Sequence, residues 1–245
     1  MTTTIVRLSA NASALLTRIA ARHAPAVLAS SFGAEDMVLI DLIARHQLPI
    51  RIFTLDTGRL PDETHALIDR TRRHYGLPVD IYAPDTRLLQ AYVREHGVNA
   101  FYDNVELRQR CCAVRKIEPL ARALVAKGAW IAGLRRAQSP TRRAIAVEEF
   151  DAAHGLPKFN PLVDWSDDDV WDYLRTHDVP YNALHDRGYP SIGCAPCTRA
   201  VAPGEDIRAG RWWWEHPGHK ECGLHHRPPI AIRIHPASAR EAVTP

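Results

Sequence analysis

Short apolar runs alternate with longer amphipathic segments through the first half of the chain, and this alternation limits the fold more than any other feature. The strand-like runs are residues 26–30, 50–55, 79–83 and 129–133. The helix-like segments are residues 34–46, residues 61–75, a segment that ends near residue 96, and residues 111–127. Repeated strand–helix units build a mostly parallel sheet that helices cover on both faces. The sequence therefore predicts an α/β fold with a doubly wound, mostly parallel sheet.

The chain changes character beyond about residue 150. Ser166 precedes three aspartates, which is typical of a capped helix start because carboxylates suit the positive end of a helix. After Pro180 the sequence is rich in Pro, Gly, Arg and Trp and has little periodicity. We expect residues 1–227 to form a single domain, in which residues 181–227 fold irregularly over the mouth of the sheet. Residues 228–245 are then a tail.

Composition and charge exclude several classes of protein. Lys and Arg number 31 against 28 Asp and Glu, a surplus too small for a protein that binds nucleic acid in bulk. The sequence contains no run of about 18 apolar residues, so no membrane span is predicted. The first seven residues lack the basic start and apolar run of a secretory signal. We therefore expect a cytoplasmic enzyme with neither nucleic acid nor membrane as its partner.

Two polar turns follow the first two predicted strands. The first turn contains Ser30, Ser31, Gly33 and Asp36, and the second is Asp56-Thr57-Gly58. Ligands of open parallel sheets bind beyond the carboxyl ends of the strands, and a Ser/Gly-rich turn at a helix start offers hydroxyls and N–H groups to a phosphate. The two turns together predict one nucleotide-binding site. The alternative is that each is an ordinary capped turn between a strand and a helix.

The five cysteines are odd in number and unevenly spaced, which does not suit an extracellular disulfide framework. Cys111 and Cys112 are adjacent, Cys194 and Cys197 form a C-A-P-C motif, and Cys222 stands alone. Adjacent cysteines on a helix diverge by roughly 100° and cannot easily pair, but they can bind two irons of one cluster. The spacing of these cysteines favours a site in which four thiolates bind a metal ion or a cluster. A structural zinc, and a mere packing role for the adjacent pair, are the alternatives.

Basic residues accompany these motifs. Lys116 lies one helical turn beyond Cys112, and cations are expected beside a negatively charged cluster. Lys220 and His225 flank Cys222, and a cationic neighbourhood lowers the pKa of a thiol and makes it a better nucleophile. Further arginines could clamp a doubly charged anion, although each could equally be a solvated surface residue: Arg135, Arg136, Arg142, Arg143, Arg208 and Arg211.

Taken together, these residues resemble the assimilatory adenylyl-sulfate (APS) reductases. The motifs that carry the resemblance occur in the family's order over about residues 25–227, and they are S-S-F-G-A-E-D at 30–36, L-D-T-G at 55–58, C-C-A-V-R-K at 111–116, G-L-R-R at 133–136 with the arginines that follow, C-A-P-C at 194–197 and E-C-G-L-H at 221–225. The family's fold is that of the adenine-nucleotide alpha hydrolases, which the resemblance implies here.

The resemblance also implies roles for individual residues. One 4Fe–4S cluster per subunit is held by Cys111, Cys112, Cys194 and Cys197. Cys222 is the nucleophile, His225 follows it, and Lys116 lies between cluster and substrate. The nucleotide faces the two turns, at Ser30, Ser31, Gly33, Asp36, Asp56, Thr57 and Gly58. The phosphosulfate contacts are expected from Arg136, Arg143, Arg208 and Arg211.

The implied activity is the thioredoxin-dependent reduction of APS to sulfite and AMP, in sulfate assimilation and cysteine biosynthesis, through an enzyme S-sulfocysteine. Thioredoxin or glutaredoxin is the expected reductant, and the oligomeric state, a homo-oligomer included, stays open. The nearest alternative is a reductase of PAPS, the 3′-phosphorylated nucleotide, or of both nucleotides. More remote alternatives are an ATP pyrophosphatase-type tRNA-thiolating enzyme, whose first turn usually reads S-G-G-x-D-S, and a zinc-binding module.

Overall fold

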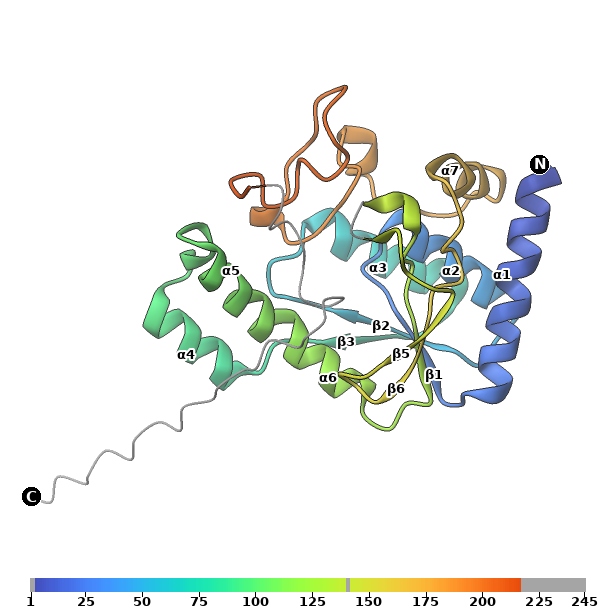
Figure 1. Ribbon diagram of the computed structural model, residues 1–245, viewed down its shortest axis with the longest axis horizontal. Helices are drawn as coiled ribbons and strands as arrows, with labels where there is room; N and C mark the ends of the chain where they lie inside the picture. The colour runs from blue at the N-terminus through green and yellow to red at the C-terminus, as the bar shows by residue number, and fades with distance from the viewer. Residues whose placement is uncertain (1–2, 140–141, 217–245) are drawn as a thin grey trace, which may run out of the picture.

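A six-stranded sheet lies at the centre of the protein, seen in a computed structural model that describes residues 3–139 and 142–216 (Figure 1). The strand order is β3-β2-β1-β4-β6-β5. The strands are β1 (Ala26–Ala29), β2 (Arg51–Leu55), β3 (Val79–Tyr82), β4 (Ala129–Ile131), β5 (Glu148–Asp151) and β6 (Leu156–Phe159). All neighbouring pairs are parallel except β5 with β6. The predicted doubly wound, mostly parallel sheet is confirmed.

Helices cover both faces of this sheet. They are α1 (Thr3–Arg22), α2 (Ala34–Arg45), α3 (Asp62–Tyr75), α4 (Thr86–His96), α5 (Val105–Cys112), α6 (Glu118–Leu124) and α7 (Asp167–Thr176). Leu28 on β1 packs in one core with side chains of α1, α2, α3 and α7. Its neighbour Val27 packs in a second core with side chains of α6. This division follows from the pleat, which sends successive side chains of a strand to opposite faces.

The predicted strands and helices occur within a few residues of their expected ends, with one difference. The segment expected to be helical over residues 111–127 begins earlier, as α5, and passes through the π-helical turn η2 (Ala113–Ile117) into α6. Pro119 in the first turn of α6 has no N–H to donate to the carbonyl of Arg115, so the regular hydrogen-bond ladder cannot continue there. The wider turn places Cys111 and Cys112 just before it.

The segment after α7 is irregular, as predicted. Residues 181–216 contain only the short helical turns η5 (His185–Arg187) and η6 (Ala195–Cys197) and one bridge between Thr198 and Arg211. This segment lies beyond the carboxyl ends of the strands (Figure 1, orange). Ser166 caps α7 with a reciprocal pair of hydrogen bonds to Asp169, which confirms the expected helix start. Within the described residues, no helix is long and apolar enough to cross a membrane.

Candidate active site

A cavity of about 480 Å³ opens at the carboxyl ends of β1, β2 and β4, where ligands of open α/β sheets bind. Its floor is formed by the strand ends and by the turn between β1 and α2. Its opposite wall is the irregular segment, through residues 190–193 and through Ile207, Arg208, Arg211 and Trp212. The cavity has the size and position of a small-molecule site.

The turn after β1 is held tightly at the floor of this cavity. Phe32 has a left-handed backbone with φ of 59°, a strained conformation for a bulky residue, and its side chain is fully buried. The Phe32 N–H donates to Ser30 Oγ at 3.1 Å. Ser31 donates through its N–H and its hydroxyl to Asp36 Oδ2, at 2.6 and 2.8 Å. Of the predicted nucleotide-binding residues, Ser30, Ser31, Gly33 and Asp36 all line the cavity.

Asp36 is a buried carboxyl group. Burial raises the pKa of Asp36 to about 6, although the two hydrogen bonds from Ser31 act in the opposite direction. The end of β4 approaches this carboxyl closely, because a Cβ added at Gly133 would lie 2.5 Å from Asp36 Oδ1. The glycine at position 133 therefore permits the contact between β4 and α2.

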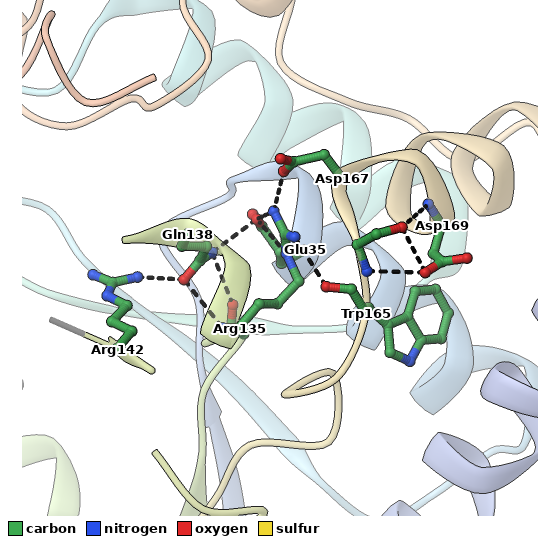
Figure 2. A network of polar contacts seen from close by, with 9 residues as sticks. Glu35, Arg135, Gln138, Arg142, Trp165, Asp167 and Asp169 are labelled. Carbon is green, nitrogen blue, oxygen red and sulfur yellow. Dashed lines mark hydrogen bonds and ion pairs between the residues drawn. The ribbon is translucent and has the colours of Figure 1, made fainter. Parts of the chain in front are cut away.

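Arg135 is the centre of a polar network on one side of the cavity (Figure 2). Its side chain is 3% exposed and pairs with Glu35 at 2.7 Å and with Asp167 at the start of α7. Gln138 also donates to Glu35, at 2.8 Å, and accepts a hydrogen bond from Arg142. Burial acts to raise the pKa of Glu35, but the charge of Arg135 and these hydrogen bonds together lower it. Glu35 is thereby held as an anion.

The structure brings only some of the predicted arginines to the cavity. Arg208 and Arg211 line it, as do Arg135 and Arg142, whereas Arg136 and Arg143 do not. Arg136 instead pairs with Asp164 and donates to the carbonyl of Ile145, and Arg143 is exposed. No sequence signal separates these adjacent arginines, since neighbouring residues in a loop can face opposite ways.

Arg211 is a second buried arginine at the cavity, with 8% exposure. Its Nη1 donates to Ser191 Oγ at 3.3 Å, and its guanidinium lies over the Trp212 ring at 4.8 Å. Its Nε has no hydrogen-bond partner among the described residues. A buried cation with an unused donor at a cavity wall is suited to bind an anion.

The second polar turn lies closer to the cysteines than to the cavity. Asp56, Thr57 and Gly58 are not part of the cavity lining, although Leu55 just before them is. Thr57 Oγ1 lies 3.3 Å from Cys194 Sγ, and the Thr57 carbonyl accepts a hydrogen bond from Arg115 at 2.6 Å. Asp56 pairs with His65 at 3.2 Å. Arg115, which follows Cys112 in η2, therefore holds Thr57 in contact with Cys194.

Four cysteines from distant parts of the chain line a second, smaller cavity next to the first. Cys111, Cys112, Cys194 and Cys197 are all buried free thiols. Burial raises the pKa of Cys111, and burial together with Cys194 raises that of Cys197 to about 12. Basic side chains share this lining, namely Arg59, Arg108, Arg115, Lys116 and Arg211. Within the described residues, no three His, Cys, Asp or Glu side chains are arranged to hold one single metal ion.

Lys116 and Arg211 belong to the linings of both cavities. Among the described residues, they are the two cations that the linings of the cysteine site and of the larger cavity share. Cys222 and His225 lie outside the described residues, as do residues 217–227 and the predicted tail at 228–245.

The fold and its cavity first define the class of protein: an α/β protein with a doubly wound, mostly parallel sheet and a small-molecule-sized cavity at the carboxyl ends of its strands. The FMN adenylyltransferase structure of Candida glabrata shares this fold, with a TM-score of 0.56 and 16% identity over 94% of this chain and 79% of that chain. At that identity the likeness shows the fold alone.

The family follows from closer similarities. The sequence profile of the phosphoadenosine phosphosulfate reductase domain matches residues 25–200. The adenosine 5′-phosphosulfate reductase of Allochromatium vinosum is 54% identical over 242 residues, which cover 98% of this chain and 94% of that protein. A crystal structure of phosphoadenylyl-sulfate reductase from Candida auris, a phosphate complex, matches with a TM-score of 0.66 and 25% identity over 82% of this chain and 98% of that chain. The chain belongs to this family of sulfonucleotide reductases, and the resemblance seen in its motifs is confirmed.

Proposed function

We propose that this protein reduces adenylyl sulfate to sulfite and AMP, with reduced thioredoxin or glutaredoxin as the electron donor. The observation that carries the proposal is the junction of two sites. Four buried thiols lie beside a nucleotide-sized cavity, and the cations Lys116 and Arg211 line both spaces. The name and high identity of the Allochromatium relative support APS as the substrate.

The cysteine site fits a 4Fe–4S cluster, one per subunit. Its donors are four buried thiols, the ligand type of iron–sulfur clusters, and they come from α5 and from the C-A-P-C turn. The surrounding arginines and Lys116 would offset the negative charge of a thiolate-bound cluster. When bound, the cluster would supply fixed charge beside the cavity and a covalent link between two distant segments.

The reaction that these parts support begins with the Cys222 thiolate, which attacks the sulfur of APS. The bond between sulfur and the phosphate oxygen breaks, AMP leaves, and Cys222 carries an S-sulfo group. A thioredoxin thiolate then attacks the Cys222 sulfur, and sulfite leaves with the bonding electron pair. The second thioredoxin thiol resolves the mixed disulfide, which returns Cys222 to the thiol and leaves thioredoxin oxidised. Arg208, Arg211 and Lys116 would stabilise the charge on the leaving phosphate.

The two nucleotides APS and PAPS can be distinguished kinetically. The chain is 54% identical to a relative named for APS and 25% identical to the Candida auris enzyme named for PAPS. It also has the four buried cysteines. We expect kcat/KM for APS to exceed that for PAPS, in an assay of sulfite release coupled to thioredoxin. An ATP pyrophosphatase reaction is disfavoured, because Phe32, Ala34 and Glu35 in the first turn depart from the S-G-G-x-D-S pattern that is usual in that class.

The decisive test is the covalent intermediate. Protein mixed with APS in the absence of any thiol is expected to gain one SO₃ group on Cys222, detected by peptide mass spectrometry. Thioredoxin added afterwards should remove the group and release sulfite. Cys222→Ser serves as the control and is expected to bind APS but to release no sulfite. Normal turnover by that variant, or no adduct on the wild-type protein, would contradict the proposal.

A further inference from the structure

The guanidinium of Arg211 fills the space where a side chain at Gly193 would begin. A Cβ added at Gly193 would lie 2.2 Å from Nη2, 2.5 Å from Cζ and 2.9 Å from Nη1 of Arg211. All three distances are far below van der Waals contact, so any side chain at position 193 would occupy the space that the guanidinium now fills. Gly193 immediately precedes Cys194 in the sequence. The segment that carries Cys194 therefore also contacts the guanidinium of the buried Arg211.

Backbone conformation does not explain the glycine at this position. The described glycines with positive φ are Gly58, Gly76, Gly97, Gly155, Gly188 and Gly204, and Gly193 is not one of them. Alanine can therefore adopt the backbone angles of Gly193 without the left-handed strain that would complicate its use as a probe. What the missing side chain provides here is space.

The backbone around Gly193 is held in place from several sides. The Gly193 N–H donates to Thr198 Oγ1 at 3.1 Å, and that hydroxyl donates to the Cys194 carbonyl at 3.0 Å. Thr198 also forms an antiparallel bridge with Arg211, and the Trp212 N–H donates to the Cys197 carbonyl at 3.1 Å. A methyl group at position 193 would therefore displace the end of the flexible Arg211 side chain sooner than the backbone.

We propose that Gly193 is a positioning residue for anion binding: its missing side chain sets where the Arg211 guanidinium faces the substrate. The inference rests on the proposed function, in which the substrate carries a phosphosulfate. Arg211 lines both cavities. The position of its guanidinium therefore determines whether this cation can contact the phosphosulfate of a substrate bound beside the cysteine site. Ser191, which accepts from Nη1 at 3.3 Å, is a weaker second support.

The test measures binding in the full-length, cluster-loaded protein with Cys222→Ser, which prevents turnover. Isothermal titration calorimetry compares APS with adenosine, which has no phosphosulfate. Gly193→Ala is expected to weaken APS binding by about 10- to 100-fold, the equivalent of one charge-assisted hydrogen-bonding group. Adenosine binding and the visible absorbance of the cluster should be unchanged. A structural defect would instead weaken both ligands or alter the absorbance.

A double-variant cycle isolates the contact. If Gly193→Ala acts through Arg211, adding it to Arg211→Ala should cost nothing further, because the displaced group is already absent. In the double variant the new methyl group at position 193 no longer meets the Arg211 guanidinium. The comparison of the double variant with Arg211→Ala therefore remains informative even if Gly193→Ala alone folds poorly. APS binding by Gly193→Ala within twofold of the parent, equal loss of both ligands, or additive losses in the cycle would overturn the inference. A parent that binds adenosine but not APS would overturn the proposed function, and this inference with it.

Discussion

At the scale of single residues, the turn after β1 shows how the structure supports an unfavourable local conformation. Phe32 adopts φ of 59°, which costs free energy for a residue of its size. Its ring is completely buried, and its N–H is bound by Ser30 at 3.1 Å. Core packing therefore maintains a backbone shape that presents Ser30 and Ser31 to the cavity.

Asp36 in the same turn makes stability depend on pH. Burial raises the pKa of Asp36 to about 6 from 3.8. Between these values the folded protein binds a proton that the unfolded chain does not, so the contribution of Asp36 is fully present below about pH 4 and is lost as the pH rises through 6. The loss is on the order of 3 kcal/mol. Asp36→Asn can still accept both Ser31 hydrogen bonds but should lack this dependence.

Urea unfolding of the wild-type protein and of Asp36→Asn between pH 4 and 7 measures the effect. The free energy of unfolding of the variant relative to the wild type should rise with pH across this range. Curves that stay parallel would show that the Asp36 carboxyl is not perturbed in the folded state.

At the scale of elements, a buried ion pair fastens the end of the irregular segment to α5. Arg108 on α5 donates to both oxygens of Glu215, at 2.9 and 2.8 Å, and both side chains are almost fully buried. The guanidinium of Arg108 also lies over the Trp212 ring at 4.8 Å. Such a pair must offset its own desolvation, and its bidentate geometry makes this feasible. The helix that carries Cys111 is thus joined to the segment that carries Arg211.

Removing one partner of this pair is expected to destabilise the protein strongly. Arg108→Ala leaves the Glu215 carboxylate buried without its partner and should lower the free energy of unfolding by about 3–5 kcal/mol. The matched control is Arg110→Ala on the same helix, because Arg110 forms an exposed pair with Glu106. That control should change stability by no more than about 1 kcal/mol. Chemical denaturation compares the two variants, and similar losses would contradict the assigned role of the buried pair.

At the scale of the whole molecule, Arg135 joins segments that are far apart in the sequence. It follows β4 and contacts Glu35 on α2, Asp167 on α7 and the Trp165 carbonyl at 3.1 Å (Figure 2). These contacts assemble one wall of the cavity from three separate parts of the chain. Gln138 extends the network to Arg142, which lines the cavity.

Loss of this hub is expected to affect both folding and the site. Arg135→Ala removes the cationic partner of Glu35, whose side chain is only 17% exposed, so the pKa of Glu35 should rise and the protein should lose about 3 kcal/mol of stability. Arg135→Lys should restore little, since a single ammonium cannot reproduce the fork that reaches Glu35, Asp167 and Trp165. The neighbouring, more exposed Arg136→Ala is the control. Thermal unfolding measures all three, and full rescue by lysine would refute the geometric argument.

Much of the architecture could be predicted from local pattern. The parallel strands, most helix ends and the Ser166 cap follow from apolar periodicity and from local hydrogen-bonding chemistry. The helix α1 was not among the predicted elements, although Ile5, Leu16 and Ile19 are buried at helical spacing. The strands β5 and β6 were not predicted either. The four residues of β6 include Pro157 and the buried Lys158, and Lys158 pairs with Glu149 of β5 at 2.9 Å. These residues do not alternate as a half-buried strand would.

The fold class, the turn that lines the cavity and the four clustered cysteines could be predicted from the amino-acid sequence, because each depends on local periodicity or on residue chemistry. Tertiary structure alone decided which of two adjacent arginines reaches the cavity, that the Asp56–Gly58 turn meets the cysteines, and that Gly193 seats Arg211. Those outcomes depend on contacts between residues distant in the chain, since packing and the burial of charge select the direction of each loop side chain.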